Sequence, residues 1–157
     1  MQEKRDYVKE ARNYLKKYGQ IKVTIENLKD DITMWQEELK LDIAAPITKY
    51  DSQPGGSMSP MTPVEAAAAR HDKLIAMIRD NERQIKDLER IIRKIDRAIG
   101  GLEPDDQFLI RGHFIDRKKW GDLSAEKFFT EKWARERSRK AIKEIAFMIF
   151  GDCRLIA

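Results

Sequence analysis

The sequence predicts an all-α protein, and three observations lead to that prediction. Two long segments carry apolar residues at alternating intervals of four and three, which is a helical spacing. The last third of the chain combines a short amphipathic helix, a turn and a second helix with a basic side. No stretch shows a convincing strand pattern. We therefore expect long N-terminal coiled-coil helices followed by a C-terminal helix-turn-helix domain.

The two long segments are expected to be helical at about residues 3–41 and 63–99. The first apolar stripe consists of Tyr7, Ala11, Tyr14, Tyr18, Ile21, Ile25, Leu28, Ile32, Trp35 and Leu39. The second consists of Val64, Ala67, His71, Leu74, Ile78, Asn81, Ile85, Leu88, Ile92, Ile95 and Ile99. Such spacing is typical of coiled coils, because a 3.5-residue period keeps one stripe facing a partner helix. The helices either fold back on each other within one chain or pair between chains.

Helix-breaking residues divide the chain into two predicted domains. Residues 44–61 contain three Pro and two Gly, which is typical of a linker. Thr62, Pro63 and Glu65 then form the pattern of a capping box at the start of the second helix. That helix is expected to end at Gly100 and Gly101. We assign residues 1–100 to a coiled-coil region and residues 102–157 to a helix-turn-helix domain with a third helix near Pro104.

The segment from Trp120 to Phe150 is expected to be the helix-turn-helix. Thr130 can cap its second helix by accepting a hydrogen bond from a free backbone N–H. One side of that helix is apolar or small, and the other is cationic. The cationic residues are Lys132, Arg135, Arg137, Arg139, Lys140 and Lys143. A major-groove recognition helix needs these two sides, although a solvated charged helix on an ordinary bundle is an equal alternative.

Composition narrows the function classes. The net charge is only +4, yet residues 117–143 hold ten Lys or Arg against four acidic residues. A local excess of six positive charges favours a defined anion-binding surface. The single cysteine, Cys153, allows no internal disulfide and fits a reducing cytosol. We expect no membrane span, signal peptide, metal site, cofactor or catalytic group, because the corresponding patterns are missing, and therefore no enzyme.

Part of the sequence resembles the fourth conserved region of bacterial primary sigma factors. The residues that carry this resemblance are Ala98 to Pro104, Leu109, Ile110, Trp120, Leu123, Thr130, Arg135, Ala141, Ile142 and Ile145. With the upstream pattern Tyr18, Ile25, Leu28 and Ile32, and with Tyr50 to Gly56 followed by Pro63 to Glu65, nearly the whole chain resembles phage regulators of the ArpU and RinA type. Those proteins control late-gene transcription in prophages of Gram-positive bacteria.

The resemblance implies a set of DNA contacts. Base contacts would fall on Glu131, Lys132, Trp133, Arg135 and Glu136, next to the cap Thr130. Phosphate contacts would fall on Arg139, Lys140 and Lys143, and the charge pattern adds Arg117, Lys118 and Lys119. Trp133 is the ambiguous member, since packing between helices is its more common role. The chain departs from the family at Lys127, where an apolar residue is usual, and at Phe128, where a small residue is usual. Phe128 or Phe129 is expected to replace the missing core contact.

We therefore expect a sequence-specific DNA-binding transcription regulator of phage or prophage genes that acts at promoters in the bacterial cytoplasm. Its expected partners are double-stranded DNA, further copies of the chain in a homodimer or higher oligomer formed through the coiled coil, and host RNA polymerase. Two alternatives stay open at this stage. One is a DNA-packaging protein similar to a small terminase subunit, and the other is a coiled-coil adaptor that binds RNA polymerase without touching DNA.

Overall fold

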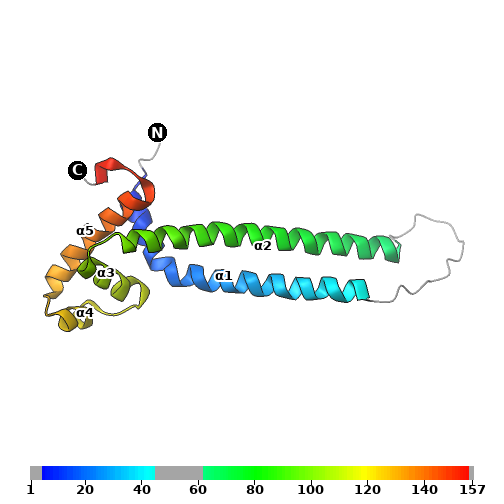
Figure 1. Cartoon of the computed structure of the whole chain (residues 1–157), viewed down its shortest axis with the longest axis horizontal. Helices are drawn as coiled ribbons and strands as arrows, with labels where there is room; N and C mark the ends of the chain where they lie inside the picture. Colours follow the sequence, from blue (N-terminus) through cyan, green and yellow to red (C-terminus); the bar gives the residue numbers. More distant parts are fainter. Residues whose placement is uncertain (1–4, 45–61, 156–157) are drawn as a thin grey trace, which may run out of the picture. The chain divides into compact units, whose positions relative to one another are not determined.

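The computed structural model describes residues 5–44 and 62–155. These residues form five α-helices, one π-helical turn and one 3-10 turn, and none of them lies in a strand. The elements are α1 (Tyr7–Ala44), α2 (Pro63–Gly100), α3 (Pro104–Ile110), η1 (Arg111–Ile115), α4 (Trp120–Lys127), α5 (Glu131–Phe150) and η2 (Cys153–Leu155) (Figure 1). The all-α prediction is confirmed for this part of the chain.

The ends of the long helices agree with the sequence. α1 continues through Gly19 without a break. At the start of α2 the Thr62 N–H donates to Glu65 Oε2 at 3.0 Å, and the Glu65 N–H donates to Thr62 Oγ1 at 3.2 Å. This is the predicted capping box, which satisfies two backbone donors reciprocally. Of the predicted linker, only its first residue, Ala44, belongs to the described part of the chain, as the last residue of α1.

The chain divides into two compact units. Unit 1 consists of Met1–Thr24 and Leu88–Ala157, and unit 2 consists of Ile25–Asp87. Each unit therefore contains part of both long helices. The short helices α3, α4 and α5 share unit 1 with the first turns of α1 and the last turns of α2. This grouping cuts across the boundary expected near residue 101, because contacts between distant parts of the chain decide it and the sequence does not show them.

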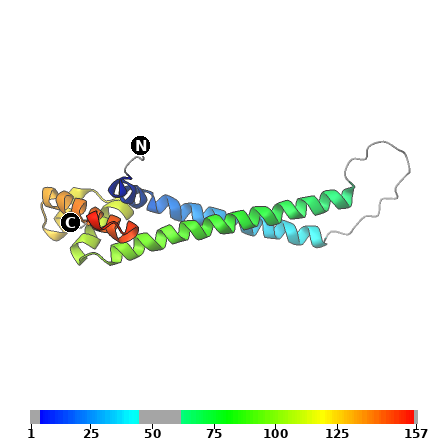
Figure 2. The ribbon, with the colours of Figure 1, turned by 90° about the horizontal axis from the view of Figure 1, so that it is seen from above.

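In unit 2 the two long helices run side by side in opposite directions, as both views show (Figures 1 and 2). Ile25 of α1 and Leu74, Asn81 and Ile85 of α2 are buried there. The side-chain amide of Asn81 donates to the carbonyl of Leu28 at 3.4 Å. The pairing is within one chain, which is one of the two arrangements that the apolar stripes allow. A polar residue at such a position favours one register, because its amide needs a specific partner.

The core of unit 1 is built from distant segments. Leu15 of α1, Ile95 and Ile99 of α2, and Ile142 and Ile145 of α5 are all fully buried or nearly so. Leu15 lies one position beyond the predicted stripe. At the edge of this core, Tyr7 of α1 stacks on Phe150 of α5 with ring centroids 4.8 Å apart. The first turns of α1 are therefore part of the same packed body as the C-terminal helix.

Tyr18 adds a polar link between the two long helices of unit 1. Its hydroxyl donates to Asp96 Oδ1 at 2.8 Å. Burial, followed by this hydrogen bond, raises the pKa of Tyr18 to about 12, because both favour the neutral phenol over the phenolate.

A second cluster holds the short helices together. It consists of Leu109, Leu123 and Ala134, with Phe108, Trp120 and Phe129 packed around it. Gly112 in the π-helical turn η1 allows Leu123 to approach the backbone. A Cβ atom at residue 112 would overlap Leu123 Cδ2 and lie 3.1 Å from Cδ1. Gly112 is buried and Leu123 is fully enclosed, so the leucine has little room to move aside.

Gly112→Ala is therefore expected to lower the free energy of unfolding by about 1–3 kcal/mol, the usual cost of an extra methyl group in a packed core. Gly121→Ala is the matched control, since residue 121 lies in α4 and a Cβ there meets nothing within 4 Å. The control should leave the stability unchanged or raise it slightly, because Gly121 lies in the first turn of α4 and an added methyl group there meets no other atom. Urea unfolding followed by circular dichroism measures both changes. Equal changes in the two variants would contradict the packing of Leu123 on Gly112.

Candidate nucleic-acid interface

The turn between α4 and α5 sets the direction in which α5 leaves the short helices. Phe128 ends α4 in the left-handed region, with φ 57° and ψ 32°. The N–H of Phe129 then donates to the carbonyl of Ser124 at 2.9 Å. Thr130 caps α5 as the sequence predicts, because its hydroxyl accepts a hydrogen bond from the Trp133 N–H at 3.1 Å. α4, a three-residue turn and α5 thus follow one another, with both ends of the turn fixed by hydrogen bonds.

α5 has one buried side and one exposed side. Its buried residues are Ala134, Ser138, Ala141, Ile142, Ile145 and Ala146. The candidate DNA contacts on this helix are exposed: Glu131, Lys132, Trp133, Arg135, Glu136, Arg139, Lys140 and Lys143. At 100° per residue, four of the cations surround Glu136 on the side opposite the core: Lys132, Arg139, Lys140 and Lys143. Within the described chain these four have no ion-pair partner.

Arg135 lies at the edge of the exposed side. Its Nη2 donates to Glu131 Oε1 at 3.0 Å, and both side chains are about half exposed. An exposed pair at this spacing contributes only about 0.3–0.5 kcal/mol. Arg135 can therefore leave Glu131 at little energetic cost, and its fork is then free to bind another acceptor.

Trp133 packs within the protein. Its ring lies 4.2 Å from the ring of Phe129, and the guanidinium of Arg137 lies 6.0 Å from its centroid. Packing leaves 37% of the residue exposed. Trp133 therefore supports the turn and presents only part of its surface to an approaching ligand.

Arg137 is the cation of α5 that points elsewhere. Its Nε donates to Asp106 Oδ1 at 2.7 Å, and its Nη2 donates to Glu103 Oε2 at 2.7 Å. Asp106 has a side chain only 4% exposed. The hydrogen bond to Asp106 raises the pKa of Arg137. Arg137 thus ties α5 to the start of α3, and the expectation that it belongs to the exposed cationic side is wrong.

Arg137→Ala is expected to lower the free energy of unfolding by about 2–4 kcal/mol, because it leaves the Asp106 carboxylate buried without its partner. Adding Asp106→Asn should recover part of that loss, since a neutral amide is less costly to bury than a charge. Urea unfolding of the wild type, both single variants and the double variant gives the coupling. Additive losses would show that the pair does not hold α5 to α3.

The connection before α4 carries three more candidate contacts, and all three are exposed: Arg117, Lys118 and Lys119. Arg117 has φ 57°, in the left-handed region. Lys118 is held by its backbone, since its N–H donates to the Gly112 carbonyl at 2.9 Å and its carbonyl lies 2.9 Å from His113 Nδ1. Its ammonium also pairs with Glu126 at 3.4 Å. Lys119 has no charged partner in the described chain, so it is freer than Lys118 to meet a phosphate.

The structure also decides between Phe128 and Phe129. Phe129 is half-buried against the cluster of Leu109, Leu123 and Ala134, and so supplies the missing core contact. Phe128 is 97% exposed. Lys127 is exposed with its ammonium 5.1 Å from the centroid of the Phe108 ring. The apolar contact at the turn is therefore made by residue 129, not by residue 127 or 128.

Phe128→Gly is expected to raise the free energy of unfolding by about 0.5–1 kcal/mol. Glycine removes a left-handed strain of about 1–2 kcal/mol and loses part of that gain through greater freedom of the unfolded chain. The ring contributes no packing, because it is almost fully exposed. Phe129→Ala is the neighbouring control and should destabilise by about 1–2 kcal/mol. Thermal unfolding measures whether each variant is more or less stable than the wild type. Destabilisation by both variants would contradict the conclusion that Phe128 is strained and unpacked.

A pocket of about 200 Å³ lies within unit 1 beside α5. Its lining comes from α1, η1, α4 and α5: Arg12, Lys16, His113, Phe114, Trp120, Arg135, Ser138, Arg139 and Ile142. His113 stacks on Trp120 with ring centroids 3.9 Å apart and forms part of the wall. Arg12 and Lys16 are not among the residues that sequence reasoning selected. Their spacing of four places both on one side of α1, but only the fold brings that side next to Arg135 and Arg139.

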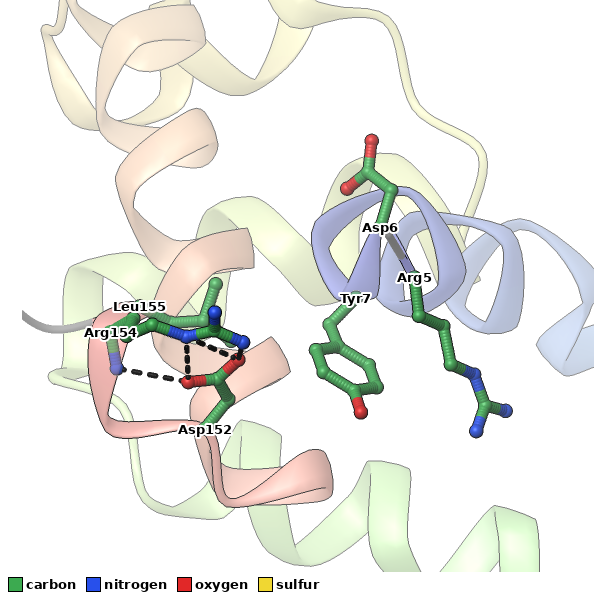
Figure 3. A pocket seen from close by; sticks show the side chains of 6 residues that line it. All are labelled: Arg5, Asp6, Tyr7, Asp152, Arg154 and Leu155. Atoms are coloured by element: carbon green, nitrogen blue, oxygen red, sulfur yellow. Dashed lines mark hydrogen bonds and ion pairs between the residues drawn. The ribbon is translucent and has the colours of Figure 1, made fainter. Parts of the chain in front are cut away.

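A larger pocket of about 380 Å³ lies between the start of α1 and η2 (Figure 3). Its charges are compensated locally. Arg154 donates to both carboxylate oxygens of Asp152, with the shortest distance 2.6 Å, while the Arg5 side chain points away from this pair (Figure 3). Arg5 bonds to Glu10 at 2.7 Å instead. With its arginines paired, this pocket offers less to a charged ligand than the pocket beside α5.

Other classes of site have less support. Among residues 5–44 and 62–155, no group of three or more His, Cys, Asp or Glu side chains is placed to hold a metal ion. In the same described ranges, no helix is apolar over a length that would span a membrane. Comparisons of the chain with protein-family models, with curated proteins and with solved structures gave no match.

Proposed function

We propose that this protein is a sequence-specific DNA-binding regulator of transcription, with α5 as its recognition helix. The observation that carries the proposal is that α5 has one buried, apolar side and one exposed, cationic side. Its apolar side is committed to the core of unit 1, and its exposed side presents Lys132, Arg139, Lys140 and Lys143 without acidic partners. A helix that enters the major groove needs an anchored back and a cationic front.

Contacts on this surface divide by chemistry. Arg135 offers a fork to a guanine edge once it leaves Glu131, and the freed Glu131 carboxylate can accept a hydrogen bond from the amino group of cytosine. Lys132 lies on the first turn of α5, where it reaches a base or a phosphate. Arg139, Lys140 and Lys143 lie further along the helix and meet phosphates, as does Lys119 before α4. Phosphate contacts position the domain, and the base contacts select the sequence.

The resemblance to ArpU- and RinA-type regulators supports a role at phage or prophage promoters. It also supports host RNA polymerase as a second partner. A dimer formed through the long helices would present two copies of α5 to two half-sites, which raises affinity because the second contact becomes intramolecular. These assignments belong to the proposal, together with a bacterial cytoplasmic location.

Duplex binding tests the proposal. A preferred duplex is first selected from a random pool with the wild-type chain, and affinity is then measured by fluorescence anisotropy over a series of salt concentrations. Arg135→Ala should weaken binding to the preferred duplex about 5- to 150-fold more than it weakens binding to random DNA. Lys119→Ala should weaken both duplexes by the same factor and reduce the salt slope by about one.

Lys73→Ala is the control, since Lys73 is an exposed cation of α2 in unit 2. It removes the same charge and should leave both affinities within twofold of the wild type, roughly the error of such a titration. Loss of binding by equal factors in all three variants would indicate a nonspecific charge effect. A wild-type chain that binds no duplex at low salt would refute the proposal and favour an adaptor that contacts only protein.

A further inference from the structure

The pocket beside α5 is lined by cations from α1 as well as from α5. It brings together four cationic side chains, Arg12 and Lys16 from α1 and Arg135 and Arg139 from α5. No Asp or Glu residue lines it. We propose that this pocket holds a phosphate of the DNA backbone, and that α1 is thereby part of the DNA interface. The inference rests on the proposed function and adds a second element to the surface.

Three of the four pocket cations have no ion-pair partner in the described part of the chain. Within the described residues Arg12, Lys16 and Arg139 have no ion-pair partner, and the carboxylate that meets Arg135 belongs to Glu131, outside the pocket lining. Like charges four residues apart on a helix destabilise it by roughly 0.2–0.5 kcal/mol, and the pocket contains two such pairs. An anion placed among them removes that repulsion and gains charge-assisted hydrogen bonds.

The packing of the two helices fixes the position of these side chains. Ala11 and Leu15 of α1 are fully buried, so the adjacent positions 12 and 16 are held at the edge of the core. Ser138 and Ile142 of α5 are buried in the same way, next to 135 and 139. Two rigid helices therefore each present a pair of cations to one cavity. Arginine suits this role, since its planar fork matches phosphate oxygens in pairs.

Size and access fit a phosphate carried by a larger molecule. The cavity of about 200 Å³ exceeds the volume of one water molecule, about 30 Å³, several times. Lys16, Arg135 and Arg139 are exposed, so the pocket can be reached from solvent. Arg139 also belongs to the exposed side of α5, next to Lys132 and Lys143 around the helix. That continuity favours a polyanion lying across α5 and α1 over an isolated small anion.

The test compares two double variants with equal loss of charge. Arg12→Gln with Lys16→Gln removes the α1 half of the pocket. Lys17→Gln with Lys22→Gln is the control, because both residues are exposed on α1 in unit 1 and lie roughly 80° or more around the helix from the pocket pair. Glutamine keeps helix propensity close to that of Lys and Arg, and circular dichroism with thermal unfolding checks that both variants fold.

The pocket variant is expected to bind both the preferred and the random duplex about tenfold or more weakly, by the same factor for each, since phosphate contacts carry no sequence information. Its salt slope should fall by about two, one for each lost contact. The exchanged pair Arg12→Lys with Lys16→Arg should restore most of the affinity. Equal losses in the pocket variant and the control variant would overturn the inference.

Two further results separate the possible failures. In the first, the wild-type chain binds duplex DNA and Arg135→Ala and Lys119→Ala behave as stated above, but the pocket variant binds duplex as tightly as the wild type. That result would overturn the role of α1 and leave the proposed function intact. The second experiment titrates the wild-type chain and the pocket variant with inorganic phosphate and with pyrophosphate. Binding is followed by tryptophan fluorescence, to which Trp120 in the pocket wall contributes. Binding of these anions that needs Arg12 and Lys16, without any effect of those residues on duplex affinity, would assign the pocket to a free anion and overturn the DNA contact.

Discussion

Burial of the apolar side of α5 is the constraint on which the rest of unit 1 depends. Ile142 and Ile145 are enclosed together with Leu15 of α1 and Ile95 and Ile99 of α2, so helices from both ends of the chain surround one core. Each fully buried side chain of this size contributes about 1.5–3 kcal/mol. Because one side of α5 is fixed in this way, the opposite side must face solvent, and its sequence is free to carry charge.

The cations of unit 1 separate into two groups according to their partners. Arg137 bonds to Asp106 and Glu103 and holds α5 to α3. Arg139, two residues later, has no acidic partner in the described chain and faces solvent beside Arg12 and Lys16. The paired Arg137 holds the fold together, whereas Arg139 forms no ion pair among the described residues and lies beside two further cations in the pocket, so a bound anion would relieve repulsion there. Residue type and sequence spacing are nearly the same in the two groups, so their difference in function is tertiary.

Periodicity and end signals predicted what is local. They gave the long helices within a few residues, the capping box at Thr62 and Glu65, the cap at Thr130 and the buried side of α5. They missed what depends on distant contacts. The stacking of Tyr7 on Phe150 groups the start of α1 with the C-terminal helix, and the bond from Arg137 to Asp106 removes one cation from the exposed side. Neither partner is near in sequence, and so a helical pattern cannot indicate either contact.

The placement of α4 shows how the fold holds the turn on which the proposed interface depends. Arg117 before α4 and Phe128 after it both have φ 57°, and neither is glycine. A left-handed residue of this kind costs of order 1–3 kcal/mol and persists only when its surroundings impose it. The surroundings here are the bond from Lys118 to Gly112 on one side and the bond from Phe129 to Ser124 on the other. Leu123 lies between them, packed on Gly112. α4 is thereby fixed at both ends and at its centre, so α5 leaves the turn in one direction. A recognition helix requires a fixed direction, because its side chains must meet base edges in a single register.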